Sequence, residues 1–442
     1  MAQTLHSGGS MATKLPILLG FTLPLLACAA DGIGTGEPSK SPNGGKTDSG
    51  WLGSDSYELG AVARGQVRME PVGSWSTLES SAELQLNLID EQLRFAKNGS
   101  EAQGYRLNLL SDQVRVLEVD YDGGDVILDY EVVVDLVAPI RDSVPELADI
   151  ANPIVDVTVP ARPVGIHDRV GTACATKADA SPLNYAYYFD ADQPGCDIER
   201  ATVEIEITHV FGRPTTYPEY DLLMKPTDRG TLGFRAALVP ARGDYDPASR
   251  FDAHRLMLEN DLNLVGQPIP GQGRRYIFAK GNVEIEIDLY DPTQVQYSES
   301  FRNALGEYDF ILYNGHSNYG KMHLLDEPES FSDHYQIIMM HSCQSYAYYT
   351  RQVFRAKETA DDPHGWDRAD VVATGKSSYP KGSPKTAEVI LQGLLDGMDA
   401  IDAGRSREAT DWLSMIESMN RVERGILYGA AGVRENRWQP ID

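Results

Sequence analysis

The chain has 442 residues, of which 42% are hydrophobic and 24% are charged, and its formal net charge is −26. This length allows two ordinary domains, and the composition excludes a fibrous or wholly disordered chain. A surface this acidic repels phosphate groups, which argues against nucleic acid as a partner and against charge-driven binding to membranes.

The first segment, residues 1–28, is predicted to be a targeting signal. Lys14 supplies a cationic start, and residues 15–26 are almost wholly apolar. This run is too short for a transmembrane helix, which needs about 20 residues. It ends in Leu-Leu-Ala-Cys28, which resembles the lipobox of bacterial lipoproteins. The resemblance implies an exported protein lipidated at Cys28 and held at the outer membrane or cell surface by the lipid alone. The alternative is an ordinary signal peptide with a coincidental cysteine.

Residues 29–55 are rich in Gly, Ser, Pro and Asp and are predicted to form a flexible tether. A β-rich domain is expected over residues 56–226, because runs such as 126–134 and 203–210 alternate or are continuously apolar between turn residues. We expect this domain to be antiparallel and similar to a β-sandwich. His209 shares the alternation of the apolar residues before it, which predicts a buried structural histidine.

The cysteines divide into separate roles. Cys174 and Cys196 lie 22 residues apart in a stretch that contains Gly, Asp and Pro. In an oxidising compartment this pair is expected to form a disulfide bond. Cys343 then has no partner, and an odd cysteine in an exported protein is either an intermolecular partner or a reactive thiol.

Residues 227–442 are predicted to form an α/β domain, because apolar strands alternate with amphipathic helices. This alternation indicates a mainly parallel sheet that helices cover on both faces. Strands are expected at residues 234–239, 283–290, 308–313, 335–340 and 371–374, and helices at residues 247–264, 298–305, 383–400 and 408–419.

Two of these strands are followed by chemically active side chains. His316 comes three residues after the run 308–313, and Cys343 comes three residues after 335–340. In an open parallel sheet, functional groups collect just beyond the carboxyl ends of the strands. The 27 residues that separate the two side chains are enough for a crossover to a parallel neighbour. A thiol becomes a competent nucleophile as the thiolate, which a nearby imidazole favours.

The segments Tyr-Asn-Gly-His316 and His-Ser-Cys343-Gln-Ser resemble the strand-end motifs of the caspase–gingipain–clostripain group of cysteine peptidases. The resemblance covers residues 231–419. It implies that Cys343 is the nucleophile, that His316 is the general acid/base, and that the backbone amides of Cys343 and Ser317 form the oxyanion hole. Ser317 stands where the group has glycine, which leaves open a domain that keeps the fold and has lost its activity.

The expected function is therefore a lipid-anchored cysteine endopeptidase that acts on a peptide or protein and needs no cofactor. The alternative is a catalytically silent surface protein that uses the fold as a scaffold. A buried thiol and a structural histidine also account for Cys343 and His316. Four histidines between residues 316 and 341 raise the hypothesis of a metal site, but their spacing fits none of the common ligand patterns, so no metal is expected.

Overall fold

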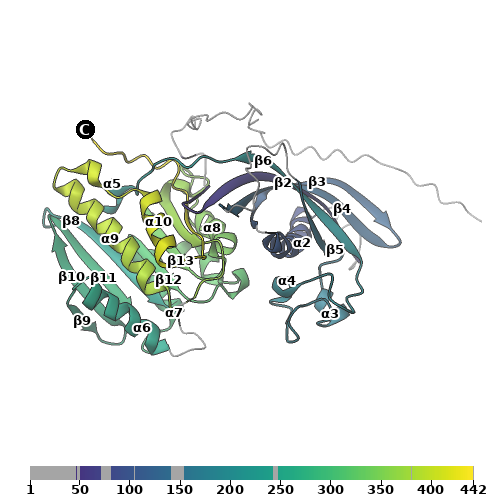
Figure 1. Ribbon diagram of the computed structural model, residues 1–442, viewed down its shortest axis with the longest axis horizontal. Coiled ribbons are helices and arrows are strands. Elements are labelled where there is room, and N and C mark those ends of the chain that lie inside the picture. Colours follow the sequence, from purple (N-terminus) through teal and green to yellow (C-terminus); the bar gives the residue numbers. More distant parts are fainter. Residues whose placement is uncertain are drawn as a thin grey trace, which may run out of the picture. The chain divides into compact units, whose positions relative to one another are not determined.

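The computed structural model describes Lys46 and residues 50–70, 81–103, 105–140, 154–241, 247–379 and 381–441 (Figure 1). All of them belong to one compact unit, Pro38–Asp442. The predicted targeting signal and its lipidation site, Cys28, lie outside the described residues. No helix in the described part of the chain is long and apolar enough to cross a membrane.

The first half of the chain forms a five-stranded sheet in which every pair of neighbours is antiparallel. The strand order is β3-β4-β2-β6-β5. Long strands with one face on an apolar core account for the alternation seen in the sequence. The strands are β2 (Ser56–Met69), β3 (Arg106–Asp122), β4 (Asp125–Pro139), β5 (Ile154–Pro160) and β6 (Arg200–Val210).

This sheet is covered by a helix rather than by a second sheet, so the expected sandwich is wrong for the described residues. Helix α2 (Ala82–Ala102) buries Ile89, Leu93 and Phe95 in one core with the strands. Cys174 belongs to the same core and forms the predicted disulfide with Cys196, which confirms that pairing. Two short helices, α3 (Ile166–Val170) and α4 (Tyr185–Tyr188), lie in the connection between β5 and β6 that also contains the disulfide.

His209 is exposed, so the prediction that it lies in the core is wrong. Ala61 pairs with Ile207, but the next residue along β2 towards its start, Gly60, pairs with His209. This bulge leaves one residue of β6 unpaired and changes which residues face the core. The alternation of the sequence therefore stops predicting burial after Ile207, and His209 packs its ring on Phe211 at a centroid distance of 4.7 Å.

The second half of the chain forms the mixed α/β architecture that the sequence predicts. Its ten-stranded sheet has the order β1-β15-β14-β13-β12-β8-β11-β10-β9, with β7 paired to β8 (Figure 1). The central strands β11, β8, β12, β13 and β14 are parallel to one another, whereas β10 and β15 pair antiparallel with β11 and β14. The strands are β7 (Lys225–Pro226), β8 (Leu232–Pro240), β9 (Gly266–Ile269), β10 (Gly273–Lys280), β11 (Val283–Tyr290), β12 (Phe310–Asn314), β13 (Gln336–His341), β14 (Ala369–Thr374) and β15 (Tyr428–Ala431).

Helices cover both faces of this sheet, and alternate strand residues belong to two different cores. Leu312 and Met339 pack with α5 (Tyr220–Leu223), α9 (Ser383–Asp402) and α10 (Trp412–Val422). Ile311 and Met340 pack with α7 (Tyr297–Glu307) and α8 (Ser345–Ala356). Helix α6 (Pro247–Leu256) continues into a π-helical turn, Met257–Asp261. Burial on both faces explains why β12, β13 and β14 are continuously apolar in sequence.

The large sheet also includes a strand from the N-terminal part of the chain, before the five-stranded sheet begins. Strand β1 (Trp51–Gly53), which lies within the predicted tether 29–55, pairs antiparallel with β15. Lys46, within the same range, is buried against Asp370 of β14. The chain therefore enters the large sheet at its edge before it forms the five-stranded sheet.

Candidate active site

The two predicted catalytic residues follow strands that are direct neighbours at the centre of the large sheet. Strands β12 and β13 are parallel, and Asn314 pairs with His341. His316 and Cys343 each lie two residues beyond this pair. The parallel strands occur in the spatial order β11-β8-β12-β13-β14, so the order reverses between β8 and β12. Crevices for ligands form beside such reversals, at the carboxyl ends of the strands.

Cys343 lies in a sharp turn between β13 and helix α8. Its side chain is half-buried, and Sγ lies 3.6 Å from the carbonyl oxygen of Ser378. The next residue, Gln344, is left-handed with φ 53°, and its backbone N–H donates to the Lys376 carbonyl oxygen at 3.0 Å. Helix α8 begins at Ser345. The turn therefore places the thiol close to a helix N-terminus, where negative charge is stabilised.

His316 lies in a turn that a glycine makes possible. Its side chain is exposed, and its carbonyl oxygen accepts a hydrogen bond from the Tyr313 hydroxyl at 2.9 Å. A Cβ atom on Gly315 would lie 2.3 Å from the Tyr313 hydroxyl oxygen and 2.6 Å from Cβ of Ala241. Only glycine fits this position without displacing its neighbours, so the residue before His316 is required by packing.

Tyr349 of α8 connects the two strand-end segments. Its hydroxyl donates to the carbonyl oxygen of Ser317, and Ser317 is buried. Burial raises the pKa of Tyr349, and the proximity of Tyr313 and of Cys343 adds to this effect. The side chain of Tyr349 is therefore close to Cys343 while it holds the segment that follows His316.

The expected oxyanion hole consists of two backbone amides, those of Ser317 and Cys343. Neither the N–H of Ser317 nor the N–H of Cys343 donates a hydrogen bond to another residue in the described part of the chain. Such N–H groups need an acceptor when water is excluded.

A buried polar cluster lies at the end of β13 beside the candidate nucleophile. His341 is fully buried and its Nε2 lies 3.2 Å from Oε2 of Glu423, which also accepts a hydrogen bond from the Tyr428 hydroxyl. Burial alone would raise the pKa of Glu423, but the bonds from His341 and Tyr428 outweigh it and lower this pKa. Nε2 of His341 and Oε2 of Glu423 are thus paired within the cluster, whereas Nδ1 of His341 is buried without a hydrogen-bond partner among the described residues.

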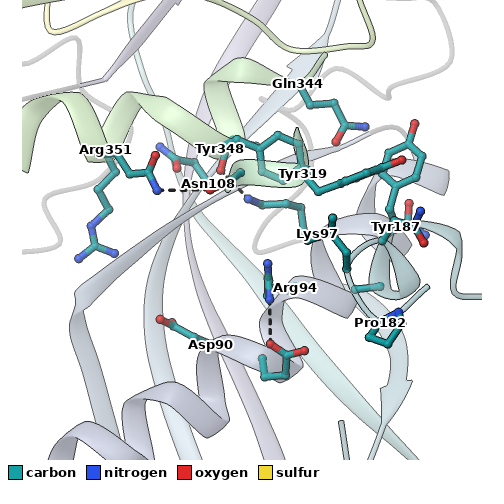
Figure 2. A pocket seen from close by; sticks show the side chains of 18 of the residues that line it. Asp90, Arg94, Lys97, Asn108, Pro182, Tyr187, Tyr319, Gln344, Tyr348 and Arg351 are labelled. Atoms are coloured by element: carbon teal, nitrogen blue, oxygen red, sulfur yellow. Dashed lines mark hydrogen bonds and ion pairs between the residues drawn. The ribbon is translucent and has the colours of Figure 1, made fainter. Parts of the chain in front are cut away.

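A cavity of about 260 Å³ lies beside this edge of the sheet (Figure 2). It is lined by α2, by α8 and by the segments that follow His316 and Cys343, which contribute Tyr319 and Gln344. His316 and Cys343 themselves do not line it. The sequence does not reveal this cavity, because Lys97 of α2 and Ala347 of α8, which meet there, lie 250 residues apart.

The other chemical hypotheses gain no support. No group of three or more His, Cys, Asp or Glu side chains with the geometry of a metal site occurs among the described residues. His323, one of the four clustered histidines, has an 87% exposed side chain that lies 3.6 Å from Asp326. No protein family model matches the chain, and no match is found among curated proteins or among solved structures.

Proposed function

We propose that this chain is an exported, lipid-anchored cysteine endopeptidase whose residues 227–442 form a caspase- or gingipain-like domain. The observation that carries the proposal is the register of the adjacent parallel strands β12 and β13. Asn314 pairs with His341, and His316 and Cys343 each follow this pair by two residues. The disulfide favours an oxidising compartment outside the cytoplasm. Cys28 is the proposed lipid attachment site, and retention of a Cys28→Ser variant on membranes would contradict it.

In the proposed reaction, the Cys343 thiol gives its proton to His316, and the sulfur attacks the carbonyl carbon of the scissile peptide bond. His316 returns the proton to the leaving amine as the C–N bond breaks, which leaves a thioester on Cys343. Water then loses a proton to His316 and attacks the thioester. The C–S bond breaks, a carboxylic acid leaves, and the thiol regains its proton.

The N–H groups of Ser317 and Cys343 would hold the oxygen that becomes negative in each step. Their lack of a partner in the described part of the chain favours this role. The N-terminus of α8 adds a favourable field for negative charge at Cys343. The serine at position 317 keeps the amide, and its carbonyl group is fixed by Tyr349.

The alternative function is a catalytically silent scaffold. Two observations favour it: the thiol is already in contact with the Ser378 carbonyl oxygen, and the cavity is not lined by either candidate catalytic residue. In that case Cys343 would be a structural thiol with no enhanced reactivity.

Alkylation of Cys343 decides between the two functions. We expect iodoacetamide to modify Cys343 in the full-length protein near pH 7 faster than it modifies free cysteine, because an adjacent imidazole favours the thiolate. Mass mapping of the labelled residue measures the rate. In the His316→Ala variant this rate should be at least about tenfold lower, which corresponds to an increase of about 1.4 kcal/mol in the activation free energy.

The matched control is His323→Ala, which removes an exposed histidine of the same loop and should leave the rate unchanged. Cleavage of a casein substrate should disappear in Cys343→Ala and in His316→Ala. An unreactive Cys343, or a rate that His316→Ala does not change, would contradict the peptidase and support the scaffold.

A further inference from the structure

The cavity between α2 and α8 is placed to hold part of a molecule bound at the candidate active site. Tyr319, three residues after His316, and Gln344, which directly follows Cys343, both line it. Consecutive Cα atoms are about 3.8 Å apart, so the cavity begins within one residue of the candidate nucleophile. A peptide bound across Cys343 would therefore reach the cavity with a residue close to its scissile bond.

The lining of this cavity carries an excess of positive charge in a protein whose net charge is −26. Three arginines, Arg94, Arg351 and Arg355, and the amine of Lys97 line it together with two acidic side chains, Asp90 and Glu91. Glu91 is already paired with Arg94 at 2.9 Å. An anion that enters the cavity therefore meets more positive than negative charge at short range.

Lys97 lines the cavity and contacts two groups of α8 (Figure 2). Its Nζ donates to the Ala347 carbonyl oxygen at 2.5 Å and lies 4.6 Å from the ring centroid of Tyr348. Burial, and then the proximity of Arg94, lowers the pKa of Lys97 to about 7. A carboxylate beside Lys97 would favour the ammonium form and gain a charge-assisted hydrogen bond.

Two buried oxygen atoms of residues that line the cavity lack a hydrogen-bond donor. Oδ1 of Asp90 and Oε1 of Gln352 have no hydrogen-bond partner among the described residues. A buried acceptor without a partner costs free energy, so a ligand that brings N–H groups would be favoured. A fully deprotonated inorganic anion such as sulfate brings no donor, whereas a peptide brings both N–H donors and, on an acidic side chain, a carboxylate.

The backbone around the cavity is strained in the two segments that reach it. Among the described residues, five other than glycine have positive φ, and three of them are Asn318, Tyr319 and Gln344. Such conformations persist only where the surrounding structure enforces them, and they gather at ligand sites. Tyr319 also packs against Tyr187 at a centroid distance of 5.5 Å, which gives the cavity an aromatic wall.

We propose that this cavity is a substrate-binding subsite that takes an acidic side chain of a peptide, close to the scissile bond. Its catalytic use rests on the proposed function, but its binding does not. The side-chain carboxylate would lie against Lys97 and Arg351, and backbone N–H groups of the same peptide would face Asp90 and Gln352. Helix α2, which packs on the five-stranded sheet, would thereby contribute to the substrate specificity of the candidate active site on the large sheet.

Binding is tested on the full-length Cys343→Ala variant, which cannot turn a substrate over. The probes are two fluorescent hexapeptide pools of neutral residues that differ in one fixed position, Glu in one pool and Gln in the other. Fluorescence polarisation should show about tenfold tighter binding of the Glu pool, the size expected for a charge-assisted hydrogen bond. Lys97→Met and Arg351→Gln should each remove most of this preference.

The matched controls are Lys385→Met and Arg421→Gln, which remove exposed ion-paired cations that do not line the cavity and should keep the preference. Circular dichroism confirms that each variant is folded. Equal binding of the two pools, or a preference that survives in both Lys97→Met and Arg351→Gln, would overturn the subsite. Failure of the peptidase would appear instead as an unreactive Cys343, with the Glu preference intact.

Discussion

At the scale of single residues, His254 shows how burial fixes a protonation state. It is fully buried in α6, with Nδ1 2.9 Å from the Arg250 carbonyl oxygen and Nε2 3.1 Å from the Ser383 hydroxyl. Because a carbonyl oxygen only accepts, Nδ1 carries the hydrogen and Nε2 accepts from Ser383. Burial lowers the pKa of His254 to about 4, so the ring is neutral at physiological pH.

This lowered pKa predicts a loss of stability in mild acid. Between pH 6.5 and 4 the unfolded chain binds a proton at His254 that the folded chain excludes, so the free energy of unfolding falls as the pH falls. The loss should reach about 3 kcal/mol at pH 4. Denaturant unfolding of the wild type and of His254→Gln at several pH values measures it, since the variant lacks this contribution. His323→Gln is the exposed control, and equal pH slopes for wild type and His254→Gln would contradict the assignment.

At the scale of elements, the start of β14 depends on a residue from before β1. The Asp370 carboxylate is buried and accepts hydrogen bonds from Tyr335 at 2.6 Å, Trp412 at 3.1 Å and Asn436 at 2.6 Å. Among the described residues its cationic partner is Lys46, at 3.2 Å, which also donates to the Gly432 carbonyl oxygen at 2.7 Å. Lys46 therefore joins the N-terminal segment to both β14 and the end of β15.

Removal of this lysine should be costly. Lys46→Met leaves the Asp370 carboxylate buried without a cation, and we expect the free energy of unfolding to fall by about 3–5 kcal/mol. Lys385→Met, which removes an exposed lysine paired with Asp261 and Glu388, should cost less than about 1 kcal/mol. Denaturant unfolding compares the two. The double variant Lys46→Met/Asp370→Asn should recover much of the loss, and no difference between the two lysine variants would contradict this role.

At the scale of the whole described chain, the two sheets share buried contacts. Trp51 of β1, Val137 of β4, Tyr346 of α8 and Ala373 of β14 form one apolar cluster. Glu58 of β2 accepts hydrogen bonds from the Tyr346 hydroxyl and from the guanidinium of Arg434, and this ion pair is buried. Helix α8, which begins just after Cys343, is therefore held by residues of the five-stranded sheet.

These contacts predict that the two sheets unfold together. The Cys174–Cys196 bond closes a loop with a sequence separation of 22 within the core of the five-stranded sheet. Removal of a disulfide bond that closes a loop of this size should lower the free energy of unfolding by about 3 kcal/mol. Scanning calorimetry of the Cys174→Ser/Cys196→Ser variant should show the entire transition at a lower temperature. An early transition for part of the protein, with the remainder unchanged, would show that the sheets unfold independently.

The sequence by itself determined the elements whose signals are local. The apolar runs at β12, β13 and β14 are buried on both faces, and the alternation over residues 283–290 predicts β11 with its observed bounds. Helix α10 begins at Trp412 rather than near residue 408, because Asp411 caps it by accepting from the Ser414 N–H. The disulfide and the positions of His316 and Cys343 beyond their strands also follow from the sequence.

Two helices that the prediction lacks have a local signal in the sequence. Helix α8 carries buried residues at positions 346, 349, 350, 353 and 354, which is helical spacing, and α2 carries Ile89, Leu93 and Ala96 in the same way. Both helices were missing from the sequence-based prediction. Because α2 covers the five-stranded sheet, its absence from the prediction is the reason why a sandwich is wrongly expected there.

Only the tertiary structure decided which strands are neighbours, what covers the first sheet, and where a cavity lies. The pairing of Asn314 with His341 comes from the packing of whole strands, and the bulge beside Gly60 comes from two strands meeting. The cavity requires α2 and α8, whose contact at Lys97 and Ala347 joins residues 250 positions apart. Hydrophobic periodicity reports how one segment faces a core, but it holds no information about which distant segment lies on the other side of that core.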